Sequence, residues 1–193
     1  NETIGDKNYT NILEGFRKGS EIDGKVYGMP FNKSTEVIWY NKTLFDELGL
    51  EVPTTFEEFA QTAKTITEKK GIVGAGFDSL NNFYTTYLKN KGVDFNSETD
   101  VTSAESVEAA NYYLDGVKEG YFRIAGTDNY LSGPFAAEQL GMYVGSNAGE
   151  SFVKQGVDGK FEIGVAAYPA ESVMQQGTDV YMFSNATAEQ RTA

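Results

Sequence analysis

The sequence predicts an α/β protein in which helices cover both faces of a sheet. Short runs of β-branched and aromatic residues, such as residues 37–40, are typical of buried strands. These runs alternate along the chain with longer segments whose apolar residues have helical spacing. Because strands that alternate with helices form sheets covered on both sides, the alternation predicts this fold class.

Three of the predicted helices have clear signals at both ends. Residues 41–49 begin with an Asn, a natural N-cap, and end with a Gly. Residues 54–71 begin with two overlapping capping boxes and also end with a Gly. Residues 102–120 repeat this pattern, with Thr102 and Glu105 as the capping box. The apolar stripe of this third helix is expected in the core: Val107, Ala110, Leu114 and Val117.

The predicted strands lie between these helices and end at polar or small residues. They cover residues 37–40, 72–77, 141–144 and 161–166. Ligands of open α/β sheets characteristically bind in crevices at strand ends. The polar residues that adjoin these strands are therefore candidates for a binding site.

The composition excludes several kinds of chemistry. The chain has 193 residues, of which 40% are hydrophobic, so it can bury one good core. It has no Cys and no His, which excludes disulfides, thiol nucleophiles, Cys/His zinc sites and histidine bases, and we expect neither cofactor nor metal. A net charge of −12 opposes binding to nucleic acid and to anionic lipid surfaces. No apolar run approaches the ~20 residues of a membrane span.

One stretch of the chain carries a resemblance to a known family. Residues 26–50 combine a turn, a polar elbow, a covered strand and a short helix, and residues 53–59 continue with Pro-Thr-Thr-Phe-Glu-Glu-Phe. This stretch resembles the bacterial extracellular solute-binding proteins of the family 1 type, which supply sugars to ABC importers. Further segments follow the same family in the same order: residues 107–121, 133–138, 142–149 and 161–169.

The resemblance implies a fold and a domain organisation. The fold would be a periplasmic binding protein-like lobe, α/β with a mixed sheet flanked by helices on both faces. Residues 1–36 would be the remnant of a first lobe and the hinge crossing, residues 37–168 the second lobe, and residues 169–193 a return segment toward the first lobe. The chain would be the central fragment of a longer protein.

The resemblance also implies a function without catalysis. The protein would bind a sugar, oligosaccharide or sugar phosphate and deliver it to ABC transporter permease subunits. It would be a monomer in the periplasm, or lipid-anchored at the outer face of the cell membrane, and it would bind no nucleic acid.

Sugars are recognised by hydrogen bonds from Asn, Gln, Ser and Asp side chains and by stacking on aromatic rings. Phe77 and Tyr143 are the predicted stacking residues, whereas Trp39 is assigned to the core, with a sugar platform as the alternative. Ser146 and Asn147 precede a helix and would donate hydrogen bonds to the ligand, or would only cap that helix. The predicted ligand-binding residues are Asn32, Ser34, Thr35, Phe77, Asp78, Ser146, Asn147, Gln176 and Gly177.

Two other functions are compatible with the residues alone. A glycoside hydrolase needs two carboxylates across a cleft, and Asp78 and Asp179 are the acidic residues at suggestive loop positions. A surface adhesion or structural domain would make the helical faces, rather than the loops, important. Lys33 is the compact candidate for binding an anionic ligand, with a solvated surface lysine as the alternative.

Overall fold

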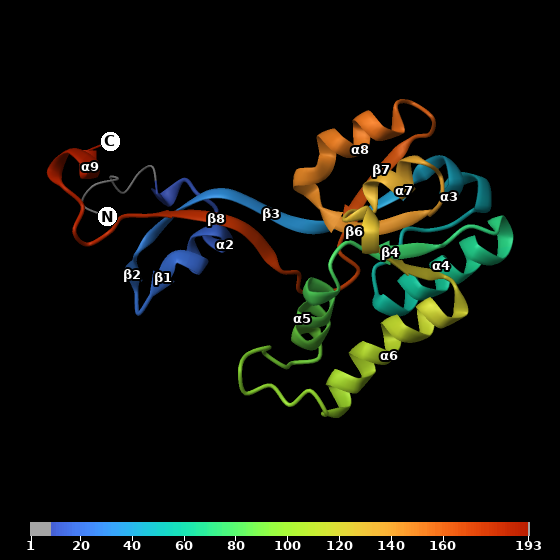
Figure 1. The fold of residues 1–193 in the computed structure, drawn as a ribbon, viewed down its shortest axis with the longest axis horizontal. Coiled ribbons are helices and arrows are strands. Elements are labelled where there is room, and N and C mark those ends of the chain that lie inside the picture. The colour runs from blue at the N-terminus through green and yellow to red at the C-terminus, as the bar shows by residue number, and fades with distance from the viewer. Residues whose placement is uncertain (1–8, 193) are drawn as a thin grey trace. The chain divides into compact units, whose positions relative to one another are not determined.

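The computed structural model describes residues 9–192, which form two compact units (Figure 1). The central unit is residues 35–174, and the terminal unit combines the described residues before Thr35 with those after Met174. The assignment of these units to the two predicted lobes stays a prediction. The first eight residues of the predicted segment 1–36, and residue 193, lie outside the described residues.

The sheet has the order β5-β4-β6-β3-β7, and β8 also pairs with β3. The parallel part consists of β4 (Ala75–Phe77), which lies between β5 (Phe122–Ile124) and β6 (Met142–Ser146). The antiparallel part consists of β3 (Gly28–Asn41), which pairs with β6 and with β7 (Ile163–Ala167). The sheet is therefore mixed, as predicted.

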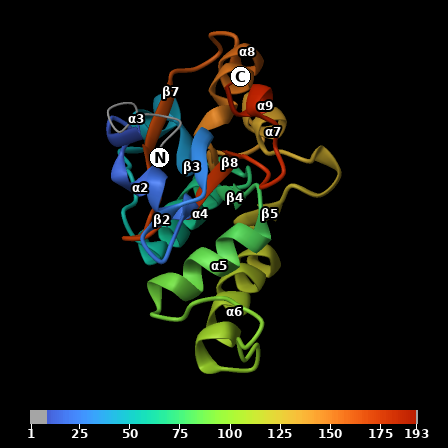
Figure 2. The ribbon, with the colours of Figure 1, turned by 90° about the vertical axis from the view of Figure 1, so that its left-hand side faces the viewer.

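Helices pack on both faces of this sheet, which confirms the predicted fold class. Alternate residues of a strand point to opposite faces. Ile38 lies in a core cluster with residues of α3 (Lys42–Leu48), α4 (Phe56–Lys70), α5 (Leu80–Asn90) and α6 (Ala104–Glu119). Trp39 points to the other face and lies in a cluster with residues of α7 (Ser132–Ala136) and α8 (Glu150–Val157). Helices α5 and α6 lie side by side in both views (Figures 1 and 2).

The predicted helix ends are confirmed, with one shift. Asn41 Oδ1 accepts a hydrogen bond from Leu44 N at 2.9 Å, as an N-cap does. Gly49, Gly71 and Gly120 end their helices in the left-handed conformation. The N-cap of α6 is Ser103 rather than the predicted Thr102, because Thr102 hydrogen-bonds to Asp100 instead.

The apolar stripe predicted to be the core face of α6 is wrong. Val107, Leu114 and Val117 are 46%, 45% and 40% exposed. The buried positions are Ser106, Ala109, Tyr113 and Gly116, which have the same helical spacing on another face. The close packing of β5 against α6 explains why this face is buried: the Phe122 ring occupies the place where a Cβ on Gly116 would stand. The Tyr113 hydroxyl also donates to the Arg123 carbonyl at 2.6 Å.

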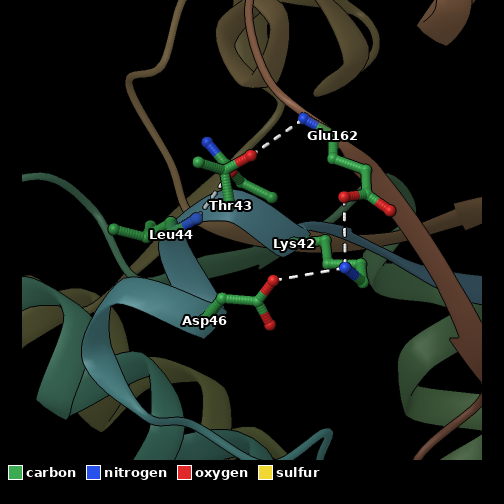
Figure 3. A network of polar contacts seen from close by, with 6 residues as sticks. Lys42, Thr43, Leu44, Asp46 and Glu162 are labelled. Atoms are coloured by element: carbon green, nitrogen blue, oxygen red, sulfur yellow. Dashed lines mark hydrogen bonds and ion pairs between the residues drawn. The ribbon is translucent and has the colours of Figure 1, made fainter.

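A network of exposed polar contacts joins α3 to the start of β7 (Figure 3). Lys42 Nζ lies 3.2 Å from Asp46 Oδ2 and 3.1 Å from Glu162 Oε2. Thr43 Oγ1 accepts a hydrogen bond from Glu162 N at 3.0 Å. We refer to these residues, together with the N-cap Asn41, as the α3 network. The two contacts to Glu162 hold α3 to the start of β7, whereas the Lys42–Asp46 pair and the Asn41 cap stabilise α3 itself.

The terminal unit contains small elements of its own. Strands β1 (Glu21–Ile22) and β2 (Lys25–Val26) form an antiparallel pair. The other described elements are α2 (Glu14–Arg17), η1 (Lys18–Ser20), β8 (Gln175–Tyr181) and α9 (Ala188–Thr192). Within residues 9–192, no helix is long and apolar enough to cross a membrane.

Candidate functional site

Polar residues of three neighbouring strands meet at one edge of the central sheet. Because β4 and β6 are parallel, their carboxyl ends lie at the same edge, where Asp78 N donates to Val144 O at 2.9 Å. The antiparallel β3 enters the central unit at this edge, since Glu36 pairs with Ser146. The edge thus brings together five residues, which we call the strand-end cluster: Thr35, Glu36, Asp78, Ser146 and Asn147. Four of the five were predicted as ligand-binding residues.

Ser146 and Asn147 use their acceptor atoms within the protein, and their donor atoms have no partner among residues 9–192. Ser146 Oγ accepts from Ala148 N at 3.2 Å and caps the short helix η3 (Asn147–Gly149), which leads into α8. Asn147 Oδ1 accepts from Thr35 N at 3.2 Å. The capping role of Ser146 is therefore present, and it does not compete with hydrogen bonds donated from Ser146 Oγ or Asn147 Nδ2. Their role toward a ligand stays a prediction.

Asp78 is a partly buried carboxylate that organises this edge. Its Oδ1 accepts a hydrogen bond from Leu131 N at 2.6 Å, which holds the loop after β5 against the end of β4. Its Oδ2 lies against Gly145, where an added Cβ would stand only 2.5 Å away. Burial raises the pKa of Asp78 to about 6, although the hydrogen bond from Leu131 acts in the opposite direction.

Glu36 is the member of the cluster that the sequence analysis missed. Its side chain is only 3% exposed, and its Oε1 accepts from Asn82 Nδ2 at 3.0 Å. Its Oε2 is buried and has no hydrogen-bond partner in the described part of the chain, and the same is true of Thr35 Oγ1. Burial raises the pKa of Glu36, and the nearby charge of Asp78 adds to this, while the bond from Asn82 opposes it. A buried carboxylate oxygen without a donor is costly and calls for an explanation.

The sequence did contain a signal for Glu36. Alternation in a strand places Glu36 on the same side as Ile38 and Tyr40, which pack in or against the larger core cluster. An acidic residue in phase with core positions predicts a buried charge. Two buried hydroxyls lie on this side as well, those of Thr86 and Tyr168, and burial together with the Glu36 charge raises the pKa of Tyr168.

The predicted stacking residues are not available for stacking. Phe77 is 1% exposed, and its ring centroid lies 5.2 Å from that of Phe59 and 4.6 Å from that of Phe83. Tyr143 is 2% exposed and packs against Phe135 in the smaller core cluster. Both predictions are wrong, because these strand residues point into the two layers of helices. Trp39 is buried, as assigned, and its indole donates to Ser146 O at 3.4 Å.

The other predicted residues belong to the terminal unit: Asn32, Ser34, Gln176 and Gly177. Gly177 has a φ of +113°, and an added Cβ would overlap the Asn32 carbonyl. The backbone conformation at this position therefore requires a glycine, whatever the role of the residue toward a ligand. A role of these four residues toward a ligand stays a prediction. Among the residues that the structure describes, no group of three or more acidic side chains is placed to hold a metal ion.

Lys33 is neither a solvated lysine nor free to bind an anion. Lys33 Nζ lies 2.8 Å from Asp179 Oδ1, and the two side chains are only 9% and 12% exposed. This contact lowers the pKa of Asp179. Because Lys33 engages Asp179, the hydrolase hypothesis loses one of its two carboxylates.

The mixed sheet with helices on both faces and polar residues at its strand ends defines a periplasmic binding protein-like fold. The chain belongs to the bacterial extracellular solute-binding protein family, whose model matches residues 2–193. Members of this family bind solutes and are not enzymes, which confirms the prediction of a non-enzymatic protein and leaves the hydrolase alternative without support.

Three similar proteins illustrate the relationship. The multiple sugar-binding protein of Streptococcus mutans is 28% identical over 185 residues, which cover 86% of this chain and 44% of that protein. The GacH receptor of Streptomyces glaucescens, solved unliganded and with acarbose, has a TM-score of 0.78 at 24% identity, with 98% and 52% coverage. UgpB from Mycobacterium tuberculosis, solved with glycerophosphocholine, has a TM-score of 0.81 at 19% identity, with 99% and 52% coverage. The chain thus spans about half the length of these relatives.

Proposed function

We propose that this chain is part of the substrate-binding component of an ABC importer and binds a sugar, oligosaccharide or sugar phosphate. The observation that carries the proposal is the strand-end cluster, which gathers four predicted ligand-binding residues at one edge of a solute-binding protein fold. The sugar-binding relative supports the ligand class.

Within the cluster, each side chain has a role that its free atoms allow. Asn147 Nδ2 and Ser146 Oγ donate hydrogen bonds to ligand oxygens, since their acceptor functions are occupied within the protein. Asp78 Oδ2 accepts a hydrogen bond from a ligand hydroxyl, since Oδ1 is held by Leu131 N.

The protein works outside the cytoplasmic membrane, as the extracellular family supports, in the periplasm or lipid-anchored at the cell surface. It acts as a monomer, and its partners are the permease subunits of the importer. Asn32, Ser34, Gln176 and Gly177 contribute further ligand contacts, as the family resemblance implies.

The Asn147→Asp variant tests the proposal directly. An aspartate keeps an oxygen for the hydrogen bond from Thr35 N but removes the free Nδ2 donor. Calorimetry on the whole gene product would use maltose, raffinose and sn-glycerol 3-phosphate as probes. We expect at least one probe to bind, and we expect the variant to bind it more weakly by about 1 to 3 kcal/mol, the cost of an unpaired buried polar group.

The matched control is Asn111→Asp, which makes the same chemical change at an exposed position of α6. This control should bind the probe as the unchanged protein does. If no probe binds, the proposed function is wrong. If a probe binds equally well to Asn147→Asp, the function stands but Asn147 is not a ligand donor.

A further inference from the structure

The charge of the strand-end cluster is negative and is not balanced by any cation within the central unit. The cluster contains two carboxylates, Glu36 and Asp78, which are close enough for the charge of one to raise the pKa of the other. In residues 35–174, no lysine or arginine side chain forms a hydrogen bond or ion pair with a member of the cluster.

The cations on neighbouring elements are engaged elsewhere. Arg123 lies on β5, next to β4, the strand that Asp78 follows, and it pairs with Asp128. Lys154 lies on α8, the helix that follows Asn147, and it pairs with Glu150. A phosphate at this edge would therefore have to be held without a free cation from these elements.

The free hydrogen-bonding atoms of the cluster also differ from those that a phosphate needs. The carboxylates contribute only acceptors: within residues 9–192, Glu36 Oε2 is buried without a donor, and the side-chain hydrogen bond of Asp78 uses Oδ1 rather than Oδ2. A phosphate dianion also contributes only acceptors. Its oxygens could not hydrogen-bond to the carboxylate oxygens of the cluster, and its negative charge would be repelled by theirs. A sugar hydroxyl can donate to Asp78 Oδ2 and accept from Asn147 Nδ2 or Ser146 Oγ.

We propose that the strand-end cluster selects an uncharged polyhydroxylated ligand, a sugar or oligosaccharide, and discriminates against sugar phosphates and glycerophosphates. Asp78 contacts a ligand hydroxyl. Glu36, which is almost fully buried, acts as a specificity-determining residue through its charge and through its hold on Asn82. This inference rests on the proposed function and narrows its ligand class, because relatives of known structure include a glycerophosphocholine complex as well as an acarbose complex.

The test compares each neutral sugar with its own phosphate ester on the whole gene product. Calorimetry at pH 7.5 would use glucose and glucose 6-phosphate, maltose and maltose 6′-phosphate, and sucrose and sucrose 6-phosphate. Glycerophosphocholine and sn-glycerol 3-phosphate complete the panel. We expect a neutral sugar to bind and its phosphate ester to bind at least about tenfold more weakly, as an incompletely screened charge repulsion over several ångströms requires.

Each outcome decides the inference. A phosphate ester or glycerophosphate that binds as tightly as any neutral sugar, or more tightly, overturns the selectivity and leaves the proposed function standing. If none of the compounds binds, the proposed function fails and the inference fails with it.

Two variants then assign the selectivity to residues. Glu36→Gln and Asp78→Asn each remove one charge with little change in shape, and each should reduce the discrimination between sugar and phosphate ester several-fold. Glu51→Gln removes an exposed charge in the connection between α3 and α4 and should leave the discrimination unchanged. Equal discrimination in all four proteins would show that neither Glu36 nor Asp78 determines the ligand class.

Discussion

The central unit carries polar groups at both ends of its segment of β3, and the two sets are in opposite states. In the α3 network, Asn41, Lys42, Thr43 and Glu162 all have partners within the fold (Figure 3). In the strand-end cluster, Glu36 Oε2 and Thr35 Oγ1 are buried and have no partner among the residues that the structure describes. The same strand therefore joins a satisfied polar region to an unsatisfied one.

This difference separates structural polar residues from candidate functional ones. Native folds satisfy nearly all of their buried polar groups, so an exception has a cost that another requirement has to offset. Both ends show polar residues next to a strand in the sequence, and either could have been read as a site. The hydrogen-bond partners, rather than the residue types, distinguish them.

The largest expected effect is on the free energy of unfolding, and it tests whether Phe77, at the end of β4, belongs to the core. Phe77 precedes Asp78 directly but is fully buried among aromatic rings, so Phe77→Ala should lower the free energy of unfolding by roughly 3 to 5 kcal/mol. Urea unfolding measures this. The control is Phe152→Ala on the exposed face of α8, which should change stability by no more than about 0.5 kcal/mol. A stable Phe77→Ala variant that loses ligand affinity would instead restore the stacking role.

The next effect is the contribution of Asp78, in the strand-end cluster, to the pH dependence of the free energy of unfolding. The folded-state pKa of Asp78, about 6, lies above its ordinary value of 3.8, so the folded protein binds this proton more tightly than the unfolded one. Asp78 therefore stabilises the fold increasingly as the pH falls from 7.5 to 5, by about 1.4 kcal/mol. The measurement is the difference in unfolding free energy between the unchanged protein and Asp78→Asn at each pH. A difference that does not vary with pH would show that the carboxyl is not perturbed.

The α3 network should respond with stability alone. Asn41→Ala removes the N-cap bond to Leu44 N and should cost roughly 1 kcal/mol of unfolding free energy. Because this end lies away from the strand-end cluster, the affinity for any sugar that binds should not change. Melting temperature and calorimetry on the same variant provide both numbers. A loss of affinity in Asn41→Ala would erase the contrast between the two ends of β3.

The smallest effect is expected for Lys42. Its two ion pairs are exposed to solvent, where the attraction between charges is weak and is screened by salt. Lys42→Ala should therefore shift the melting temperature only slightly, and the shift should vanish at high salt. A large shift that persists at 1 M salt would mean that the network contributes more than its exposure indicates.

Local signals in the sequence were sufficient for the ends of the three capped helices, but not for the strands: β3 begins at Gly28 rather than at residue 37, β4 begins at Ala75 rather than at residue 72, and β5 was not predicted. The N-cap Asn41 and the glycines that end α3, α4 and α6 act within a few residues of themselves, so the sequence states them directly. The fold class follows from the same local alternation. The strand-end position of Asp78, Ser146 and Asn147 also follows, since the end of a strand is a local property.

Properties that depend on distant residues were not predictable in this way. The buried face of α6 depends on how closely Phe122 approaches Gly116, and helical spacing alone allows another face. The burial of Phe77 and Tyr143 depends on which helices cover each face of the sheet. The hydrogen-bond partner of Glu36, Asn82, lies on α5, 46 residues away along the chain, and the unpartnered oxygen of Glu36 is visible only in the folded structure.

Gly145 shows how a residue without a side chain constrains the chemistry of a neighbour. It lies on β6, faces the carboxylate of Asp78, and leaves no room for a methyl group beside Oδ2 or beside the ring of Tyr143. A larger residue at this position would displace the carboxylate, and under the proposed selectivity it would change ligand discrimination without touching a ligand. Sequence variation at position 145 is therefore tied to variation at position 78, and the two positions should change together or not at all as related proteins diverge.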